Sequence, residues 1–370
     1  MLKIAFIYIV IVFSIILGDV RLPSFDRTKP CISVYSTHRI GEGLLQDRVE
    51  RAAKNMGWNV IRVRLEEHLP KFCLTAHFYY SALSLVNLIY KPIFNLAVTH
   101  YFFAVPYGYN VTYLNVPNSM IISRSGFVEK YKHLAKYDAY VDLYSVSNGK
   151  NPKLLNALER SGNKDALIIP MYISHDYVEY SPAKRDRMLL VGSLWGCNRA
   201  SDRLKDALYN LGKNEMLIAY GIEDLEFLDD AFKGMVEDSG EKGKSMDQIF
   251  ALQKKYGISL VVHSLEHMIA GMPTSRVAES AAAGAIIISD GNKFIKNTFG
   301  DSALYFNSLV LEDEIYSQLK NHIEWIRSHP KEAEQKARKA HKIFMDNFAI
   351  EKQLVRLLNI VESRNSSSPQ

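Results

Sequence analysis

Hydrophobic positions along this chain form two kinds of pattern, short continuous runs and longer stretches with helical spacing. Residues 31–35 are a run of the first kind, and a turn is predicted at Gly41-Glu42-Gly43. Residues 45–56 then repeat at the spacing of one helix face, and residues 58–63 are a second apolar run. Gly57 separates the helix from the second run, as glycine often does at helix ends. Strand, helix and strand in this order predict a βαβ unit, from which parallel sheets are built.

The alternation continues through the first half of the chain and then starts again. Further strands are predicted at residues 94–98, 111–116, 139–144 and 167–169. After a turn-rich, charged segment at 174–187, strands are predicted at 188–191, 216–220, 259–263 and 285–289, and helices at 200–210, 246–256 and 275–283. Two such series predict an α/β protein with two Rossmann-like domains facing a central cleft, where ligands bind beyond the carboxyl ends of the strands.

The carboxyl-terminal region is predicted to be helical. Apolar stripes at helical spacing run from Ile315 to Ile326 and from Ile350 to Val361, with a break at His329-Pro330 between them. We therefore expect domains at residues 31–175 and 186–345, a helix at 346–363 and a disordered polar tail at 364–370.

The amino terminus carries a different pattern. Lys3 precedes an apolar run at residues 4–17, which Gly18-Asp19 ends. A span of the bilayer takes about 20 apolar residues, so this run is short for a permanent span. It is typical of a signal peptide or a signal anchor over residues 1–20, with a buried first strand as the alternative. The expected location is the membrane or the secretory pathway, on the cytoplasmic face if the protein is bacterial and anchored.

Composition narrows the class of protein. The chain has 370 residues, 48% of them hydrophobic and 23% charged, which excludes a largely disordered chain. The net charge of +5 suits an anionic ligand but is too small and too evenly spread for a nucleic-acid-binding protein. Three cysteines lie far apart, without the spacing of a metal site.

The candidate chemistry concentrates in residues 263–290. Pro273 stops any preceding helix, Thr274 or Ser275 can cap a new one, and Gly284 can end it in a left-handed conformation. A helix that starts here presents backbone N–H groups and the positive end of its dipole, which suit phosphate oxygens.

Two charged residues on this helix extend the prediction. Arg276 supplies a forked cation that can bind a diphosphate at two points. Glu279 follows three residues later on the same face, where its carboxylate can accept hydrogen bonds from ribose hydroxyls. The alternative is an ordinary ion pair on the helix surface.

The segment from Pro273 to Asp290, PTSRVAESAAAGAIIISD, resembles the nucleotide-sugar-binding signature of GT-B glycosyltransferases. It looks closest to the CgeB-like and exostosin-like branches, with a glycosyltransferase group 1-like C-terminal domain. The resemblance is specific over residues 259–306 and looser over 186–350. It implies a donor-binding domain at 186–345, an acceptor-binding domain at 31–175, and a final helix that packs back toward the N-terminal domain.

The resemblance also implies roles for individual residues. Glu279 matches the carboxylate that holds the donor ribose, and Ser275 and Arg276, after Thr274, match positions beside the diphosphate. Related retaining enzymes carry an earlier glutamate at the place that Gly271 occupies here. Glu266 is the nearby residue that could substitute for it.

Weaker candidates lie at the ends of predicted elements. On the donor side they are Gly192, Arg199 or Arg203, and Gly221, and on the acceptor side they are His38, Arg39, Gly41 and Gly43. His263 and His267 border the expected cleft, where either can act as a base or hold the leaving phosphate. Turn glycines, surface arginines and structural histidines are the alternatives.

The predicted function is transfer of a sugar from a nucleoside diphosphate to a glycan, lipid or protein acceptor. The sequence contains no Asp-x-Asp, so we expect no metal or other cofactor, and Arg276 with the helix start would neutralise the leaving diphosphate. The competing classes are a non-catalytic glycosyltransferase-like structural protein, a periplasmic-type solute-binding protein and a GT-B-fold epimerase. In a secretory protein, Asn110-Val111-Thr112 and Asn365-Ser366-Ser367 would be glycan acceptors.

Overall fold

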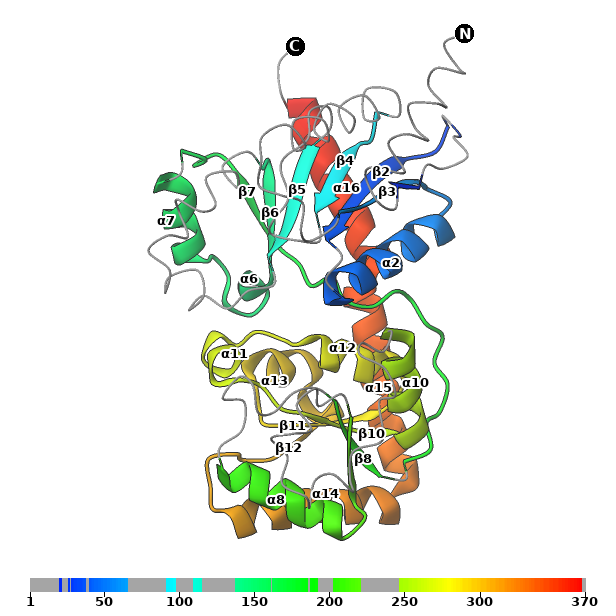
Figure 1. Ribbon diagram of the computed structural model, residues 1–370, viewed down its shortest axis with the longest axis vertical. Helices are drawn as coiled ribbons and strands as arrows, with labels where there is room; N and C mark the ends of the chain where they lie inside the picture. Colours follow the sequence, from blue (N-terminus) through cyan, green and yellow to red (C-terminus); the bar gives the residue numbers. More distant parts are fainter. Residues whose placement is uncertain are drawn as a thin grey trace. The chain divides into compact units, whose positions relative to one another are not determined.

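Figure 1 shows the computed structural model, which describes residues 20–21, 26, 28–37, 40–65, 91–97, 109–114, 137–160, 162–185, 187–191, 202–220 and 246–367. The chain divides into two units. Unit 1 consists of Met1–Ser145, Gly149–Asp176 and Ile350–Gln370, and unit 2 of Val146–Asn148 and Tyr177–Ala349. Each unit is built on its own sheet.

Unit 1 contains a sheet in the order β1-β3-β2-β4-β5-β6-β7. Its strands are β1 (Val20–Arg21), β2 (Cys31–Thr37), β3 (Asn59–Leu65), β4 (Phe94–Ala97), β5 (Tyr109–Leu114), β6 (Ala139–Asp142) and β7 (Leu167–Pro170). All neighbouring strands are parallel except β1, which pairs antiparallel with β3. Val20 is thus part of the sheet, while residues 1–19 of the predicted signal or anchor lie outside the described residues.

One face of this sheet is covered by two helices that lie far apart in the sequence. They are α2 (Ile40–Asn55) and α16 (Ile350–Ser367), and both contribute to one hydrophobic core with β2, β4, β5 and β6. Leu354 and Leu357 of α16 are fully buried, as is Val49 of α2. Unit 1 also contains α7 (Pro152–Arg160), and α6 (Leu143–Asn148) begins within it. Its core is therefore completed by the last helix of the chain.

Unit 2 contains a fully parallel sheet in the order β12-β11-β10-β8-β9. Its strands are β8 (Met188–Val191), β9 (Leu217–Tyr220), β10 (Ile258–Val261), β11 (Ile286–Ser289) and β12 (Leu304–Tyr305). The strand order reverses between β8 and β10, and in open α/β sheets ligands bind outside the carboxyl ends at such a point.

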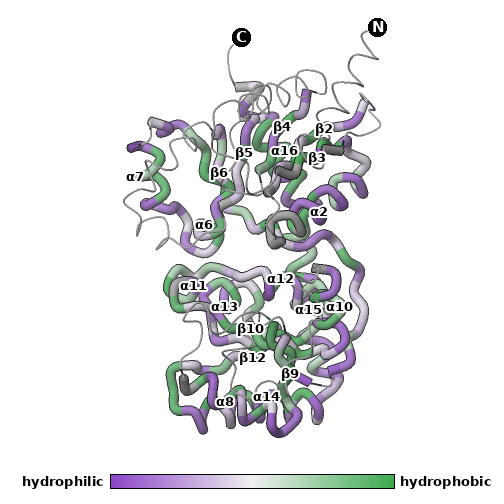
Figure 2. The backbone as a smooth tube through the Cα atoms, viewed as in Figure 1, coloured by the Kyte–Doolittle hydropathy of each residue, from purple (hydrophilic) through white to green (hydrophobic). Residues whose placement is uncertain are grey.

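The helices of unit 2 cover both faces of its sheet. They are α8 (Asp202–Lys213), α10 (Met246–Tyr256), α11 (Leu265–Ala270), α12 (Ser275–Ala282), α13 (Lys293–Phe299), α14 (Glu312–Ser328) and α15 (Pro330–Phe348). Met188 and Leu190 of β8 face a core with α8 and α14, and Leu189 and Val191 face α10. Figure 2 shows the hydrophobic segments along β9 and β10. Both faces of the buried parallel strand β8 are therefore apolar.

The predicted α/β fold with two Rossmann-like sheets is confirmed, and several boundaries are corrected. Gly41 and Gly43, predicted to form a turn, lie in the first turn of α2. The strand predicted at 139–144 ends at Asp142, whose Oδ2 accepts a hydrogen bond from Ser145 N at 3.1 Å and caps α6. The prediction of Asn110 as a glycan acceptor is wrong for the folded protein, because Asn110 lies in β5 and is only 9% exposed.

The part of the chain that the structure describes contains no helix that is both long and apolar enough to span a membrane.

Gly284, predicted to end the helix before β11, has a φ of +69° and follows α12. A Cβ there would lie 2.9 Å from the carbonyl oxygen of Ser181, whereas a Cβ at Gly57, with a φ of +77°, would meet nothing within 4 Å. We expect Gly57→Ala to lower the free energy of unfolding by about 1 kcal/mol, the cost of the left-handed backbone. Gly284→Ala should cost about 2–4 kcal/mol, because the steric clash is added.

Urea unfolding of the two variants, followed by circular dichroism, measures both costs. Gly57→Ala serves as the control for backbone conformation without the clash. Equal losses in the two variants would show that the contact with Ser181 is relieved without cost.

His175 of unit 1 makes the stability of this unit depend on pH. Burial, followed by the positive charge of Arg48, lowers the pKa of His175 from 6.5 to about 4. Between these values the unfolded chain binds a proton that the folded chain does not, so stability falls as the pH decreases. We expect a loss of up to about 1.4 kcal/mol per pH unit from this group between pH 6.5 and 4. Urea unfolding of wild type and His175→Gln at pH 7.0, 5.5 and 4.5 isolates the contribution of His175. Equal slopes of the free energy of unfolding against pH in the two proteins would contradict the prediction.

Candidate functional site

The first residues of α12 are half-buried, and the backbone N–H groups at a helix start suit an anion. Thr274 occupies the N-cap position with an extended backbone, and its side chain makes no capping hydrogen bond. The N–H of Val277 bonds to the carbonyl of Thr274, which starts the helix directly after Pro273. The N–H groups of Ser275 and Arg276 in the first turn lie at the positive end of the helix dipole, as the sequence predicts.

Arg276 and Glu279 form an ion pair that is mostly buried. Nη1 of Arg276 donates to Oε2 of Glu279 at 2.6 Å, and the side chains are 28% and 0% exposed. Oε1 of Glu279 is buried and has no hydrogen-bond partner among the described residues. An unsatisfied buried acceptor costs about 1–3 kcal/mol, more when it is charged. The pair is therefore no ordinary surface pair, and one carboxylate oxygen keeps a hydrogen-bonding capacity that no described residue uses.

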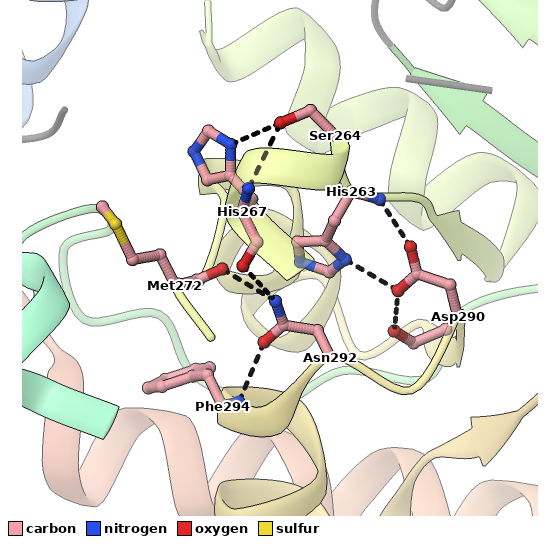
Figure 3. A network of polar contacts seen from close by, with 8 residues as sticks. His263, Ser264, His267, Met272, Asp290, Asn292 and Phe294 are labelled. Atoms are coloured by element: carbon pink, nitrogen blue, oxygen red, sulfur yellow. Dashed lines mark hydrogen bonds and ion pairs between the residues drawn. The ribbon is translucent and has the colours of Figure 1, made fainter. Parts of the chain in front are cut away.

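His263 lies just beyond the carboxyl end of β10 and is bound by Asp290, just beyond the end of β11 (Figure 3). The backbone N–H of His263 donates to Oδ2 of Asp290 at 2.7 Å, and its Nδ1 lies 2.8 Å from Oδ1. Both side chains are at most 2% exposed. Adjacent parallel strands end at the same edge of the sheet, so β10 and β11 bring together residues 27 positions apart.

A second set of hydrogen bonds fixes the loop between β10 and α12 (Figure 3). Nδ2 of Asn292 donates to the carbonyls of His267 at 3.1 Å and Met272 at 3.0 Å, and its Oδ1 accepts from Phe294 N at 2.8 Å. Nδ1 of His267 lies 2.8 Å from Oγ of Ser264, the N-cap of α11. His267 is therefore part of a helix cap, and its ring points toward Ser264.

Glycine at position 271, where related retaining enzymes carry a glutamate, has a structural basis. Gly271 ends α11 in the left-handed conformation, with a φ of +60°. A Cβ at this position would lie 3.1 Å from Cβ of Lys293, which is tight. A glutamate would be strained here, so the local backbone is built for glycine. Glu266 lies on α11, and its side chain is outside the described residues.

The predicted site residues divide into three groups. Thr274, Ser275, Arg276, Glu279 and His263 lie together in unit 2, in the segment from the end of β10 to α12. Gly41 and Gly43 lie in α2 of unit 1, and Arg203 lies in α8. The candidates His38, Arg39, Gly192, Arg199 and Gly221 lie outside the described residues.

The sequence analysis missed Asp290 and Asn292. Both follow the apolar run of β11, and polar residues at the carboxyl end of a parallel strand are the signal that would have found them. The described residues contain no group of three His, Cys, Asp or Glu side chains that could hold a metal ion.

The two Rossmann-like sheets and the long C-terminal helix define the GT-B fold, and solved structures of glycosyltransferases share it. A glycosyltransferase from Rickettsia africae is 12% identical with a TM-score of 0.55, and the alignment covers 92% of this chain and 100% of that one. The Phytolacca americana UGT2, complexed with UDP-2fluoro-glucose and pterostilbene, is 12% identical with a TM-score of 0.50, covering 90% and 100%. At such identities the likeness shows the fold alone.

Residues 240–359, about a third of the chain, match the family model described as "Glycosyl transferase-like". The matched region contains α12 and the residues of the candidate site, which confirms the resemblance to glycosyltransferases that the sequence indicates. The pneumococcal O-GlcNAc transferase GtfA, in complex with UDP and GlcNAc, is 11% identical with a TM-score of 0.50. That alignment covers 78% of this chain and 60% of GtfA. No curated protein sequence matches the chain.

Proposed function

We propose that this protein is a glycosyltransferase that moves a sugar from a nucleoside diphosphate to an acceptor. The observation that carries the proposal is the buried carboxylate of Glu279 in α12, which Arg276 binds through one oxygen while the other has no partner among the described residues. This arrangement offers hydrogen-bond acceptors to ribose hydroxyls beside a cation and helix N–H groups for a diphosphate. The family match over residues 240–359 supports the same assignment.

The proposed chemistry uses the charges of the site. Breaking the bond between sugar and phosphate develops negative charge on the leaving diphosphate and positive character on the sugar. Arg276 and the first-turn N–H groups of α12 stabilise that negative charge as preorganised donors. Glu279 binds the ribose and thereby places the diphosphate at the helix start. The proposed reaction needs no metal ion, because these groups supply the positive charge.

The acceptor and the location are further parts of the proposal. We assign acceptor binding to unit 1 and expect a glycan, a lipid or a protein as the acceptor. Residues 1–20 are proposed as a signal peptide or anchor, which places the protein at the membrane or in the secretory pathway. The neighbouring structures that contain UDP or a UDP-sugar support a nucleotide-sugar donor.

A glycosyltransferase-like protein without catalytic activity is the second candidate. Gly271 favours this candidate, because a glycine with a left-handed backbone stands where the family resemblance places a carboxylate. Such a protein would neither hydrolyse nor transfer a sugar from any donor that it binds.

Calorimetric titration with UDP, GDP, CDP and ADP tests the proposed function. The sample is the chain without residues 1–19, which keeps β1 in the sheet of unit 1. We expect one of the four to bind with a micromolar dissociation constant, which would identify the base of the donor. A folded sample that binds none of them would overturn the proposal, and binding without turnover of the corresponding sugar donors would favour the second candidate.

A further inference from the structure

The carboxylate of Asp290 binds His263 at two points and leaves the ring one free nitrogen. Oδ2 accepts from the backbone N–H of His263 at 2.7 Å, and Oδ1 lies 2.8 Å from the ring Nδ1. The hydroxyl of Ser289 donates to Oδ1 at 3.2 Å. A carboxylate only accepts hydrogen bonds, so the geometry places a proton on Nδ1, and in the neutral imidazole Nε2 is then an acceptor.

Nε2 of His263 has no hydrogen-bond partner within the described ranges, although the side chain is 0% exposed. In Figure 3, Nδ1 is turned toward Asp290 and the other ring nitrogen points away from it. His267, the next histidine, has its ring turned toward Ser264. A buried acceptor without a partner costs free energy, and a bound group that donates a hydrogen bond recovers it.

We infer that Asp290 is a positioning residue that presents Nε2 of His263 to a hydroxyl group of the nucleotide sugar. This inference rests on the proposed function and deepens it. His263 follows β10, which flanks the point where the strand order of unit 2 reverses, and ligands bind at that edge of such sheets. A ring nitrogen without a proton accepts from a hydroxyl but cannot donate to a phosphate oxygen. The geometry therefore selects a hydrogen-bond donor, and the donors of the ribose and of the sugar are chiefly hydroxyls.

Asp290→Asn tests the inference with almost no change in shape. One side-chain oxygen must still accept from the backbone N–H of His263, so the new NH₂ group faces Nδ1. The ring proton then moves to Nε2, which changes from an acceptor to a donor. We expect at least a tenfold loss of affinity in calorimetric titrations, while the protein remains folded.

The probes are UDP, GDP, CDP and ADP, each free and as its glucose conjugate. A loss for the free diphosphate as well as its conjugate places the hydroxyl on the ribose. A loss confined to the conjugate places it on the transferred sugar. Either result supports the inference.

Three controls separate positioning from general damage. Asp176→Asn changes another buried aspartate, which pairs with Arg51 in unit 1, and should leave nucleotide affinity unchanged. In a His263→Ala background, Asp290→Asn should cause no further loss, because Asp290 acts through the ring. Nitrogen-15 NMR of the histidine rings at pH 7.5 should show the proton of His263 on Nδ1 in wild type and on Nε2 in Asp290→Asn.

The outcomes distinguish this inference from the proposed function. A wild type that binds none of the eight probes overturns the proposed function and this inference with it. Equal affinities of wild type and Asp290→Asn for a probe that both bind would overturn this inference alone. A wild-type His263 ring with protons on both nitrogens would do the same. If Asp290→Asn does not fold, the wild-type NMR spectrum and the affinity of His263→Ala decide the question.

Discussion

Replacing Glu279 by glutamine is expected to weaken binding of the nucleoside diphosphate by about 1.5–3 kcal/mol, the range for a hydrogen bond to a charged group. The stability of the free protein should stay the same or increase. Glu279 is fully buried, and one of its oxygens has no partner among the described residues, so the carboxylate costs free energy in the absence of ligand. Calorimetry measures the first effect and urea unfolding the second.

The opposite directions of these two effects make the prediction specific. A residue that only supports the fold would lose stability when changed and keep its affinity for nucleotide. Gln353, which is 3% exposed on α16 of unit 1, offers a control, because Gln353→Ala should affect stability without affecting nucleotide affinity. Loss of stability together with unchanged affinity in Glu279→Gln would make Glu279 a structural residue.

Replacing Arg276 by alanine is expected to lower the turnover number by about 10²–10³, the effect of removing one preorganised donor to developing negative charge. It should also lower the free energy of unfolding, because Glu279 then loses the donor that binds its Oε2. Activity is therefore compared at a temperature at which circular dichroism shows both proteins to be folded. The measurement is donor hydrolysis or transfer at saturating donor.

Two further variants control this experiment. Arg276→Lys keeps the charge but loses the forked geometry, and we expect it to recover part of the activity. Arg356→Ala removes an exposed arginine of α16 and should leave turnover unchanged. If Arg276→Ala turns over the donor as fast as wild type, Arg276 has no role in stabilising the leaving diphosphate.

The elements around the candidate site were predictable where breakers and large apolar residues mark them. Pro273 and Gly284 bound α12, and the apolar residues after Gly284 form β11. In contrast, α11 is not predicted, because its six residues are too few to show a helical period, and its apolar Leu265 and Ile269 are exposed at 62% and 79%. For α15 the sequence predicts only a helical region without a strong apolar stripe, because three of the six positions that it buries are alanines, Ala333, Ala337 and Ala340.

The contacts within the site depend on the order of the strands, which no local pattern contains. Asp290 binds His263 because β10 and β11 are neighbours in the sheet. Gly41 and Gly43 were placed in a turn because glycine favours turns, but glycine also fits the first turn of a helix. Predictions from sequence thus held for elements that breakers and buried apolar runs mark, and they did not reach the contacts that the order of the strands decides.

The place of α16 in unit 1 has a consequence for the synthesis of the protein on the ribosome. Four side chains of this helix, Ile350, Leu354, Leu357 and Val361, are fully buried in the core of unit 1. The sheet that they cover is translated first, so the part of its apolar face that α16 covers stays exposed until residues 350–361 emerge. Apart from Val146–Asn148, unit 2 is the continuous segment Tyr177–Ala349, so its sheet can form before α16 is translated. We therefore expect the amino-terminal unit to complete its core after unit 2 has formed, and a premature stop codon before residue 350 would leave it without part of that core.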